Sequence, residues 1–386
     1  MGDDHSATHT TTSIASLHMP DDTLIDQLRL CMISGIGPRL RQALLERFGS
    51  ASAVLQAAPS ELSGVPGVGA KLSRAISLSG EEVDVEAEIE RCRGGNIDIV
   101  TDQDDRYPRM LHEIHDPPGL LFCRGTLLPQ DNLAVAIVGA RHATRYGITQ
   151  AERLAGALAR AGVTVVSGVA RGIDGAAHRG ALAAGGRTIA VLGSGLLDIY
   201  PPEHASLADE VAASGAVISE NQTQAKPLAG AFPQRNRLIS GIALGTIVVE
   251  ASERSGALIT ARHAYEQGRE VFAVPGRVDS RLSQGCHRLI RDGAKLVETI
   301  DDVLEELGPL VEATSAADGQ VVRHPAELQL NEMEQQVLQA IDTEPTLIDQ
   351  VIRETGLAPQ QVLSIVSVLE MRRLVRRISG SSVARM

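Results

Sequence analysis

The chain has 386 residues, of which 43% are hydrophobic, so it is long and apolar enough for two or three domains with packed cores. Its net charge of -12 at pH 7 excludes a chain that is basic throughout, although a local basic patch can still bind nucleic acid. The four cysteines are scattered without a CxxC pair, which argues against a disulfide framework and a zinc site and favours a reducing cytoplasm.

The first 22 residues are polar and rich in threonine and serine. They lack the apolar core of a signal peptide, so we expect a disordered tail. No stretch of 18 apolar residues occurs anywhere, and no membrane span is expected.

Residues 23–90 are expected to form a helical domain of the SAM-like or helix-hairpin-helix type. Two glycine turns, in ISGIGPRL and in SGVPGVGAKL, each lead into an amphipathic segment. Such a turn can direct backbone N–H groups at a DNA phosphate from a helix N-terminus. The alternative is a small packing domain whose glycines only make tight turns.

Residues 91–307 are expected to form a Rossmann-like, doubly wound α/β domain with extra strands. Short runs rich in β-branched residues alternate there with helical stretches such as 149–162 and 255–268, which predicts a mostly parallel sheet covered on both faces. The expected strands are 97–100, 120–123, 134–139, 163–168, 187–193, 215–220, 245–251, 269–276 and 294–298.

Ligands of such sheets bind beyond the carboxyl ends of the strands. The loops that follow these strands are rich in glycine, hydroxyl groups and arginine, and residues 232–295 carry ten Arg or Lys against six Asp or Glu, a local net charge of +4. Four cations there, Arg141, Lys226, Arg235 and Arg237, are candidates for surrounding a polyanion, and Phe232 is a candidate for stacking on a base.

Residues 308–327 are mixed and polar and are expected to be a linker. Three helical segments and a basic end then predict a winged helix over residues 328–386. This module reads DNA or, alternatively, binds another protein.

Several kinds of catalytic or cofactor site are disfavoured. The chain has no GxGxxG after the first strand of the α/β domain and no GxxxxGK[ST], so neither a dinucleotide site nor an ATP-driven motor is expected. Asp174 and His178 are four residues apart and could act as an acid–base pair, but an Asp at a helix start is more often a cap or first-turn charge. No metal site and no cofactor are expected.

Six motifs in residues 100–300 resemble the DprA/Smf family, DNA processing protein A. They occur in the family's order, and the flanking helical and winged-helix segments fit its wider architecture. The chain departs from the family at His204, where a YPxxN motif would have Asn. The motifs are IVGARHATRYG (137–147), SGVARGIDGAAHRGAL (167–182), AVLGSGLLDIYP (190–201), FPQRNRLISG (232–241), VVEASERSGALITARHAYEQGREVFAVPG (248–276) and GCHRLIRDGA (285–294).

The resemblance implies a dimeric protein, without catalysis, that binds and protects single-stranded DNA in natural transformation and loads the RecA recombinase on it. Arginine and lysine side chains would contact phosphates, Phe232 would lie against a base, and small residues would line the pocket. The candidate DNA-binding residues are Arg141, Ser167, Gly168, Gly172, Gly193, Gly195, Lys226, Phe232, Arg235, Asn236, Arg237, Ser255, Gly256 and Thr260.

Two other functions are compatible with parts of the chain. Glycine loops and arginines at strand ends also occur in nucleotide phosphoribohydrolases, for which Glu250 would be the catalytic candidate, but the PGGxGTxxE motif of that group is missing. A transcription regulator would use the winged helix on DNA and the α/β domain as a sensor.

Overall fold

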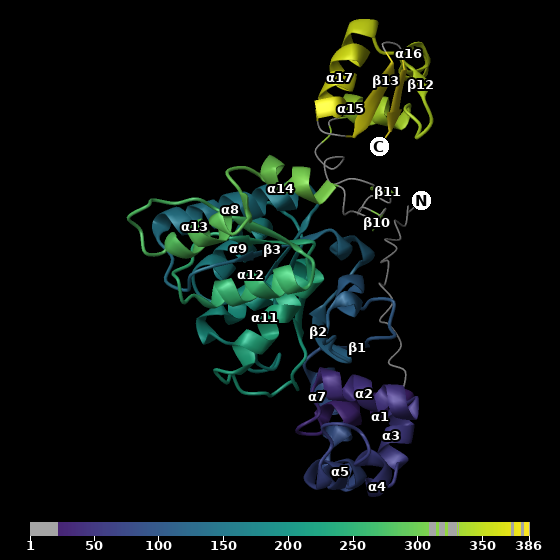
Figure 1. The fold of residues 1–386 in the computed structure, drawn as a ribbon, viewed down its shortest axis with the longest axis vertical. Coiled ribbons are helices and arrows are strands. Elements are labelled where there is room, and N and C mark those ends of the chain that lie inside the picture. The colour runs from purple at the N-terminus through teal and green to yellow at the C-terminus, as the bar shows by residue number, and fades with distance from the viewer. Residues whose placement is uncertain are drawn as a thin grey trace, which may run out of the picture. The chain divides into compact units, whose positions relative to one another are not determined.

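The computed structural model describes residues 22–308, 314–315, 321–322, 330, 332–371, 374–379 and 382–385. Residues 1–21 of the expected tail and most of the expected linker therefore lie outside the described residues, whereas Asp22 begins the first helix. The chain divides into two compact units close to residue 85 (Figure 1). Within these units the remaining domain limits stay predictions.

The first unit is all-helical, as expected. Its core consists of aliphatic side chains such as Leu30, Leu44 and Ile76, which are almost fully buried. Both predicted glycine turns lead into helices, the first at Pro38 and the second at Ala70. The helices are α1 (Asp22–Met32), α2 (Pro38–Phe48), α3 (Ala51–Gln56), α4 (Pro59–Leu62), α5 (Ala70–Ser77) and α6 (Ser79–Glu82).

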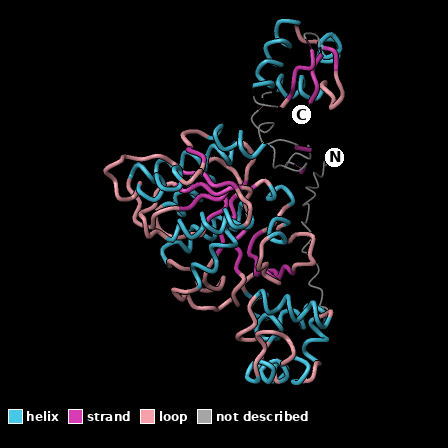
Figure 2. Tube along the Cα trace, viewed as in Figure 1, coloured by secondary structure: helices cyan, strands magenta, loops and turns pink. Residues whose placement is uncertain are grey.

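A nine-stranded sheet, drawn in magenta in Figure 2, forms the centre of the second unit. Its order is β1-β2-β6-β5-β4-β3-β7-β8-β9; β2 pairs antiparallel with β1 and β6, and all other pairs are parallel. The mostly parallel sheet predicted from the sequence is confirmed. The strands are β1 (Asp98–Thr101), β2 (Leu120–Gly125), β3 (Ala134–Val138), β4 (Thr164–Ser167), β5 (Thr188–Val191), β6 (Ala216–Ser219), β7 (Gly245–Val248), β8 (Glu270–Ala273) and β9 (Lys295–Leu296).

Helices cover both faces of this sheet. Figure 1 shows α11 and α12 on one side of β3, with α8 and α9 on the other. The helices of this unit are α7 (Val85–Gly94), α8 (Arg145–Arg160), α9 (Ile173–Ala183), α10 (Ala205–Ser214), α11 (Ala231–Ile242), α12 (Gly256–Glu266), α13 (Gln284–Arg291) and α14 (Ile300–Leu307), with 3₁₀ turns η1 (Arg109–Glu113), η2 (Pro129–Asn132) and η3 (Pro202–His204).

The central strand β3 shows why its run of apolar residues is needed. Successive side chains of a strand point to opposite faces, and here both faces are covered. Ala136 and Val138 pack in the core beneath α11 and α12, whereas Val135 and Ile137 pack in the core beneath α8 and α9. An alternation of polar and apolar residues would leave one of these cores with buried polar groups.

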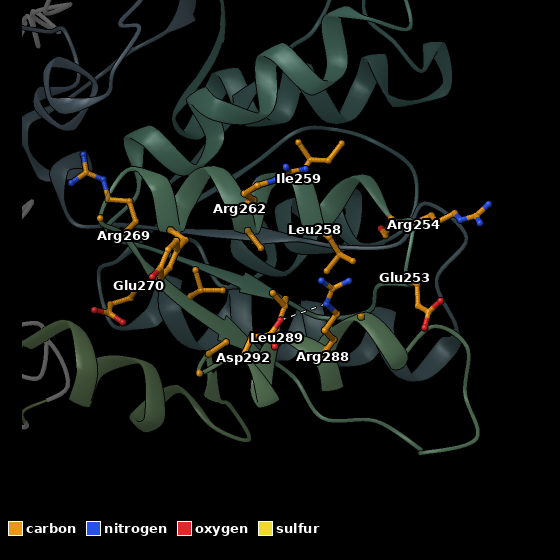
Figure 3. Close-up of a pocket in the computed structure, with 18 residues that line it drawn as sticks. Glu253, Arg254, Leu258, Ile259, Arg262, Arg269, Glu270, Arg288, Leu289 and Asp292 are labelled. Carbon is orange, nitrogen blue, oxygen red and sulfur yellow. Dashed lines mark ion pairs between the residues drawn. The ribbon is translucent and has the colours of Figure 1, made fainter.

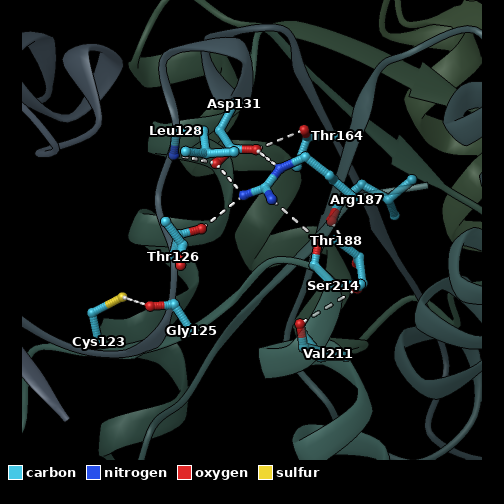
Figure 4. A network of polar contacts seen from close by, with 11 residues as sticks. Cys123, Gly125, Thr126, Leu128, Asp131, Thr164, Arg187, Thr188, Val211 and Ser214 are labelled. Atoms are coloured by element: carbon cyan, nitrogen blue, oxygen red, sulfur yellow. Dashed lines mark hydrogen bonds and ion pairs between the residues drawn. The ribbon is translucent and has the colours of Figure 1, made fainter. Parts of the chain in front are cut away.

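A polar network lies at the amino ends of the parallel strands, at the edge of the sheet opposite their carboxyl ends (Figure 4). The Arg187 guanidinium donates to both carboxylate oxygens of Asp131 at 2.8 Å, and also to the main-chain oxygens of Thr126 and Ser214. Asp131 accepts a further hydrogen bond of 2.9 Å from Thr164 at the start of β4. Because the buried carboxylate is paired and hydrogen-bonded, we interpret this network as structural.

The C-terminal part has the expected winged-helix composition. Three helices and a small sheet of order β12-β14-β13 enclose a separate apolar core that includes Val351 and Val366. The elements are α15 (Glu332–Gln339), β12 (Thr346–Leu347), α16 (Ile348–Thr355), α17 (Pro359–Met371), β13 (Val375–Ser379) and β14 (Ser382–Arg385). A two-stranded sheet, β10 (Thr314–Ser315) and β11 (Val321–Val322), precedes them in the chain.

Candidate nucleic-acid interface

A cavity of about 570 Å³, here called the edge cavity, lies at the carboxyl edge of the parallel strands. From β3 the chain proceeds outward through β4, β5 and β6 and then returns to the other side of β3 with β7, so the sheet has its switch point between β3 and β7. Open α/β sheets bind their ligands at such a point. The lining residues are Val138, Gly139, Arg141, Ala170, Asp174, Tyr200, Pro227, Ala229, Phe232, Pro233, Arg235, Asn236, Ile239, Gly256, Ala257, Ile259 and Thr260.

Two neighbouring rings with a cation at each end form a row of four side chains, here called the ladder. Three of them, Arg141, Phe232 and Tyr200, line the edge cavity, and Arg171 lies beside Tyr200. Arg141 Cζ lies 5.2 Å from the centroid of the Phe232 ring. The Phe232 and Tyr200 centroids are 5.7 Å apart, with the rings inclined by 50°. Arg171 Cζ lies 5.9 Å from the Tyr200 centroid. Planar rings beside cations are the arrangement that stacks bases and pairs with phosphates.

The exposure of the ladder makes it available to a ligand. Arg141 and Arg171 are exposed, Tyr200 is 37% exposed and Phe232 is half-buried. Glycine at position 193 allows the ring of Phe232 to lie where it does, because a Cβ there would be only 3.0 Å from Phe232 Cδ1.

Arg235 lies in the wall of the cavity but is 4% exposed. Its Nη1 donates to the main-chain oxygen of Gly168 at 2.9 Å and to that of Val191, and its Nε donates to Asn236 Oδ1 at 3.3 Å. A Cβ at Gly168 would come within 2.5 Å of Nη1, so a larger residue there would displace the guanidinium of Arg235. Arg235 therefore ties α11 to the ends of β4 and β5.

The charge state of this wall follows from burial. Burial lowers the pKa of Arg235 to about 10, against the opposing effect of the Asp174 carboxylate, so Arg235 remains a cation at neutral pH. Burial raises the pKa of Asp174, which Arg235 and the main chain of Ala170 and Gly168 oppose. Asp174 is the first-turn charge of α9, as the sequence favoured.

His178 does not join Asp174 at the cavity. Its ring is fully buried, and Nδ1 lies 2.8 Å from Thr188 Oγ1. The pKa of His178 is lowered to about 3, chiefly by burial and to a smaller extent by the nearby His204. The acid–base pair suggested by the four-residue spacing is therefore not assembled in the edge cavity.

Arg237 and Lys226, both predicted phosphate contacts, differ from Arg141 in their surroundings. Arg237 is 6% exposed, pairs with Glu220 and Asp116, and does not line the cavity. The side chain of Lys226 is 80% exposed and its Nζ lies 3.1 Å from Asp198 Oδ2. Its neighbour in sequence, Pro227, lines the cavity, which places Lys226 beside it.

The predicted small and hydroxyl residues separate into two groups. Gly256, Thr260 and Asn236 line the cavity, and Asn236 Nδ2 donates to the Gly256 oxygen at 3.4 Å. Ser167 is fully buried and its hydroxyl donates to the Ile137 oxygen at 2.6 Å within the sheet. Ser255 caps α12 by accepting from the Ala257 N–H at 3.3 Å and lines a different cavity.

Two further predicted glycines support the loops around the cavity. Gly172 has φ +77°, and a Cβ there would lie 2.2 Å from the Ala140 oxygen, so glycine lets α9 begin against the loop that carries Arg141. A Cβ at Gly195 would lie 2.2 Å from the Thr223 oxygen. Both glycines position the loops by close backbone approach.

The loop after β4 carries an unusual backbone conformation. Val169, a β-branched residue, has φ +57°. Its main-chain oxygen accepts a hydrogen bond of 2.8 Å from His204 Nδ1. Backbone strain of this kind persists only where the surroundings hold it, and it concentrates at functional sites.

Tyr200 and Arg171 were not among the candidates from the sequence. The candidates after the strand that became β5 were Gly193 and Gly195, whereas the chain returns to the cavity at Tyr200. An aromatic residue and an arginine inside the quoted motifs were the available signal. In a chain with 2% aromatic residues, Tyr200-Pro201 merited the same attention as Phe232-Pro233.

A second cavity, of about 920 Å³, lies between α12 and α13 (Figure 3). Arginines and carboxylates line it in near balance, and several are paired: Arg288 with Asp292 at 3.5 Å and Arg269 with Glu113 at 2.7 Å. The edge cavity differs from this second cavity in the neighbouring rings of Phe232 and Tyr200 that line it.

Glu250, on which the phosphoribohydrolase alternative depends, is 3% exposed. Its carboxylate accepts from the N–H of Thr144 at 2.9 Å and from its hydroxyl at 2.6 Å. It is not among the residues that line the edge cavity.

Among the residues that the structure describes, no group of three or more His, Cys, Asp or Glu side chains is placed to hold a metal ion. None of the described helices combines the length and apolarity that crossing a bilayer requires.

Comparison with known proteins places three family models along the chain. The model for DNA recombination-mediator protein A matches residues 98–308, the model for the DprA winged helix domain matches residues 318–381, and the model for a SAM-like helix-hairpin-helix tandem matches residues 28–79.

Relatives and solved structures agree with these matches. Protein Smf of Synechocystis sp. is 34% identical over 379 residues, which are 90% of this chain and 95% of that protein. The DNA processing protein DprA of Streptococcus pneumoniae is 47% identical over 203 residues, 53% of this chain and 72% of that one. The X-ray structure of DprA from the same organism matches with a TM-score of 0.64 and 35% identity, over 75% of this chain and 99% of that one. A DNA processing protein A from Helicobacter pylori, described by its single-stranded DNA binding mode, matches with a TM-score of 0.50 and 31% identity, over 55% of this chain and 97% of that one.

Proposed function

Because the chain belongs to the DNA recombination-mediator protein A family, we propose that it binds single-stranded DNA at the edge cavity without sequence preference. The bound strand is protected there and RecA recombinase is loaded on it during natural transformation. The protein acts as a cytoplasmic homodimer, without catalysis.

The ladder is the observation that carries this proposal. Every base has a face that can stack on an aromatic ring, and every nucleotide has a phosphate, so rings beside cations bind unpaired strands whatever their sequence. The two rings, Phe232 and Tyr200, and the flanking Arg141 and Arg171 provide both contacts in one continuous row. Bases in a duplex are already stacked and paired, so the rings discriminate against duplex DNA.

Phosphate binding is assigned to the exposed cations. Arg141, Arg171 and Lys226 have side chains that a phosphate can reach. Arg235 contributes positive potential from the wall while it holds the loops together, and Arg237 is neutralised by Glu220 and Asp116. Of the two arginines of FPQRNR, neither is needed as an exposed phosphate contact.

The first test is the relative affinity for unpaired and paired DNA. We expect a labelled oligo-dT to bind more tightly than a duplex of equal length. Phe232→Ala is expected to weaken oligo-dT binding by the equivalent of ~1–3 kcal/mol, the usual contribution of a stacked base. Fluorescence anisotropy measures both, and equal affinity for the two DNAs would contradict the proposal.

Two variants of the experiment separate the alternatives. Deleting residues 328–386 is expected to leave oligo-dT binding in place, whereas a winged-helix regulator would lose all DNA binding. Incubation with nucleoside monophosphates is expected to release no free base, whereas a phosphoribohydrolase would release it.

RecA loading and dimerisation need their own measurements. We expect the protein to accelerate RecA filament formation on single-stranded DNA. Light scattering measures the rate of filament formation. A homodimer joins two binding sites and so raises avidity. Sedimentation should therefore give twice the mass of the 40.8 kDa chain, and a monomer would contradict this part of the proposal.

A further inference from the structure

The outer half of the ladder supports an inference that rests on the proposed function. We propose that Tyr200 and Arg171 form a second nucleotide position beside the edge cavity, and that Glu203 occupies the phosphate place of this position while no strand is bound. The acidic side chain thus competes with DNA and limits its affinity.

The geometry of the rings separates this position from the one at Phe232. The two ring planes are inclined by 50°, so bases stacked on Phe232 and on Tyr200 cannot be parallel. A bound strand therefore turns between them, and each ring takes its own nucleotide. Arg171 then lies over the outer ring as Arg141 lies over the inner one.

Glu203 has the chemistry of a phosphate substitute. Its Oε1 lies 2.5 Å from Arg171 Nε, and both side chains are about half exposed, at 49% and 46%. The Glu203 carboxylate, and after it the Tyr200 hydroxyl, raises the pKa of Arg171. Guanidinium groups bind carboxylate and phosphate oxygens by the same hydrogen bonds. An exposed ion pair is weak enough for a phosphate to displace the carboxylate.

One hydrogen bond between the two loops holds Arg171 and Glu203 in place. His204, directly after Glu203, donates to the main-chain oxygen of Val169, two residues before Arg171. Val169 has a positive φ, and Glu203 lies on the short 3₁₀ turn η3. The hydrogen bond between His204 and Val169 therefore positions Arg171 and Glu203 opposite each other. It does not use the side chain of Arg171 or of Glu203.

Glu203→Gln is the central test, because this exposed change keeps the size of the side chain and removes its charge. We expect oligo-dT to bind about two- to fivefold more tightly, as expected when an exposed ion pair no longer competes. The log–log salt slope should stay near the wild-type value, because Arg171 neutralises one phosphate in the bound state of both proteins. The matched control is Glu306→Gln, which removes the carboxylate of the Lys295 ion pair and should leave both quantities unchanged.

The ring and the cation are tested separately. Tyr200→Ala should weaken binding roughly five- to 150-fold, whereas Tyr200→Phe keeps the ring and should stay within about twofold. Arg171→Ala should reduce the salt slope by roughly 0.7. The controls are Tyr265→Ala and Arg160→Ala, exposed residues near the ends of α12 and α8, at the opposite edge of the sheet.

The outcomes distinguish this inference from the proposed function. If wild-type protein binds oligo-dT and Phe232→Ala weakens binding, but Glu203→Gln and Tyr200→Ala leave it unchanged, the second position is wrong and the proposed function stands. If wild-type protein does not bind oligo-dT at all, the proposed function fails and the inference fails with it. Circular dichroism of each variant confirms that the fold is retained.

Discussion

At the scale of single residues, burial divides the arginines around the site into two kinds. Arg141 and Arg171 lie exposed beside rings, where a ligand can reach them. Arg235 and Arg237 are almost fully buried and hydrogen-bond to main-chain oxygens. The sequence presents Arg141, Arg235 and Arg237 as equal candidates and leaves Arg171 out, because burial depends on contacts with residues far away in the chain.

Because of this difference in burial, two arginine substitutions should change the free energy of unfolding by different amounts. Arg235→Ala should lower the free energy of unfolding by roughly 2–4 kcal/mol, because it leaves the Gly168 and Val191 oxygens without their donor and Asp174 without its nearby cation. Arg141→Ala should change it by less than about 0.5 kcal/mol, as usual for a surface residue. Urea unfolding measures both; equal destabilisation would show that Arg141 too is structural.

The buried His178 gives a prediction about pH. Its folded pKa of about 3 lies below the ordinary 6.5, so between these values the unfolded chain binds a proton that the folded chain does not. The free energy of unfolding should therefore fall as the pH drops below 6.5, by up to about 1.4 kcal/mol per pH unit from this group. In His178→Asn the decline between pH 6.5 and pH 5 should be shallower. Urea unfolding at each pH measures this decline. A decline that is the same in wild type and in His178→Asn would contradict the low pKa assigned to His178.

At the scale of elements, the sheet could be predicted almost completely. Each expected strand contains or overlaps an observed one, because a parallel sheet covered on both faces requires continuous apolar runs that few other structures need. Helix starts were less accurate. The helix expected from residue 149 begins at Arg145, because Thr144 caps it and is itself held by Glu250 from the end of β7.

The Thr144 cap has a measurable value. Its hydroxyl accepts from the Gly147 N–H at 3.2 Å and donates to Glu250. Thr144→Ala should lower the free energy of unfolding by about 1–2 kcal/mol, since both the cap and one partner of a buried carboxylate are lost. Thr144→Ser keeps the hydroxyl and should retain most of that stability. Thermal unfolding compares the two variants, and equal losses would mean that the hydroxyl is not what matters.

The site could be predicted as a region but not as a set of side chains. The carboxyl edge, Arg141, Phe232 and several glycines followed from the rule that ligands bind beyond parallel strands. Tyr200 and Arg171 did not, because only the path of the loop after β5 brings Tyr200 back to Phe232. Ser167 and Arg237 were also predicted but do not line the edge cavity, because a motif gives the position of a residue but not the direction of its side chain.

At the scale of the whole molecule, net charge and binding site have opposite signs. The chain carries -12, so long-range attraction to DNA is not expected from the molecule as a whole. Affinity must come from local cations and rings, and acidic neighbours such as Glu203 and Asp198 offset the cations at the cavity. A modest number of phosphate contacts should therefore govern binding.

The dependence of oligo-dT affinity on salt tests the central claim most directly. With Arg141, Arg171 and Lys226 as contacts, a plot of log affinity against log salt concentration should have a slope near -2, roughly 0.7 for each phosphate neutralised on a single strand. Arg141→Ala should make that slope shallower by about 0.7, while Arg160→Ala should leave it unchanged. A slope that Arg141→Ala does not alter would show that single-stranded DNA is bound elsewhere than at the edge cavity.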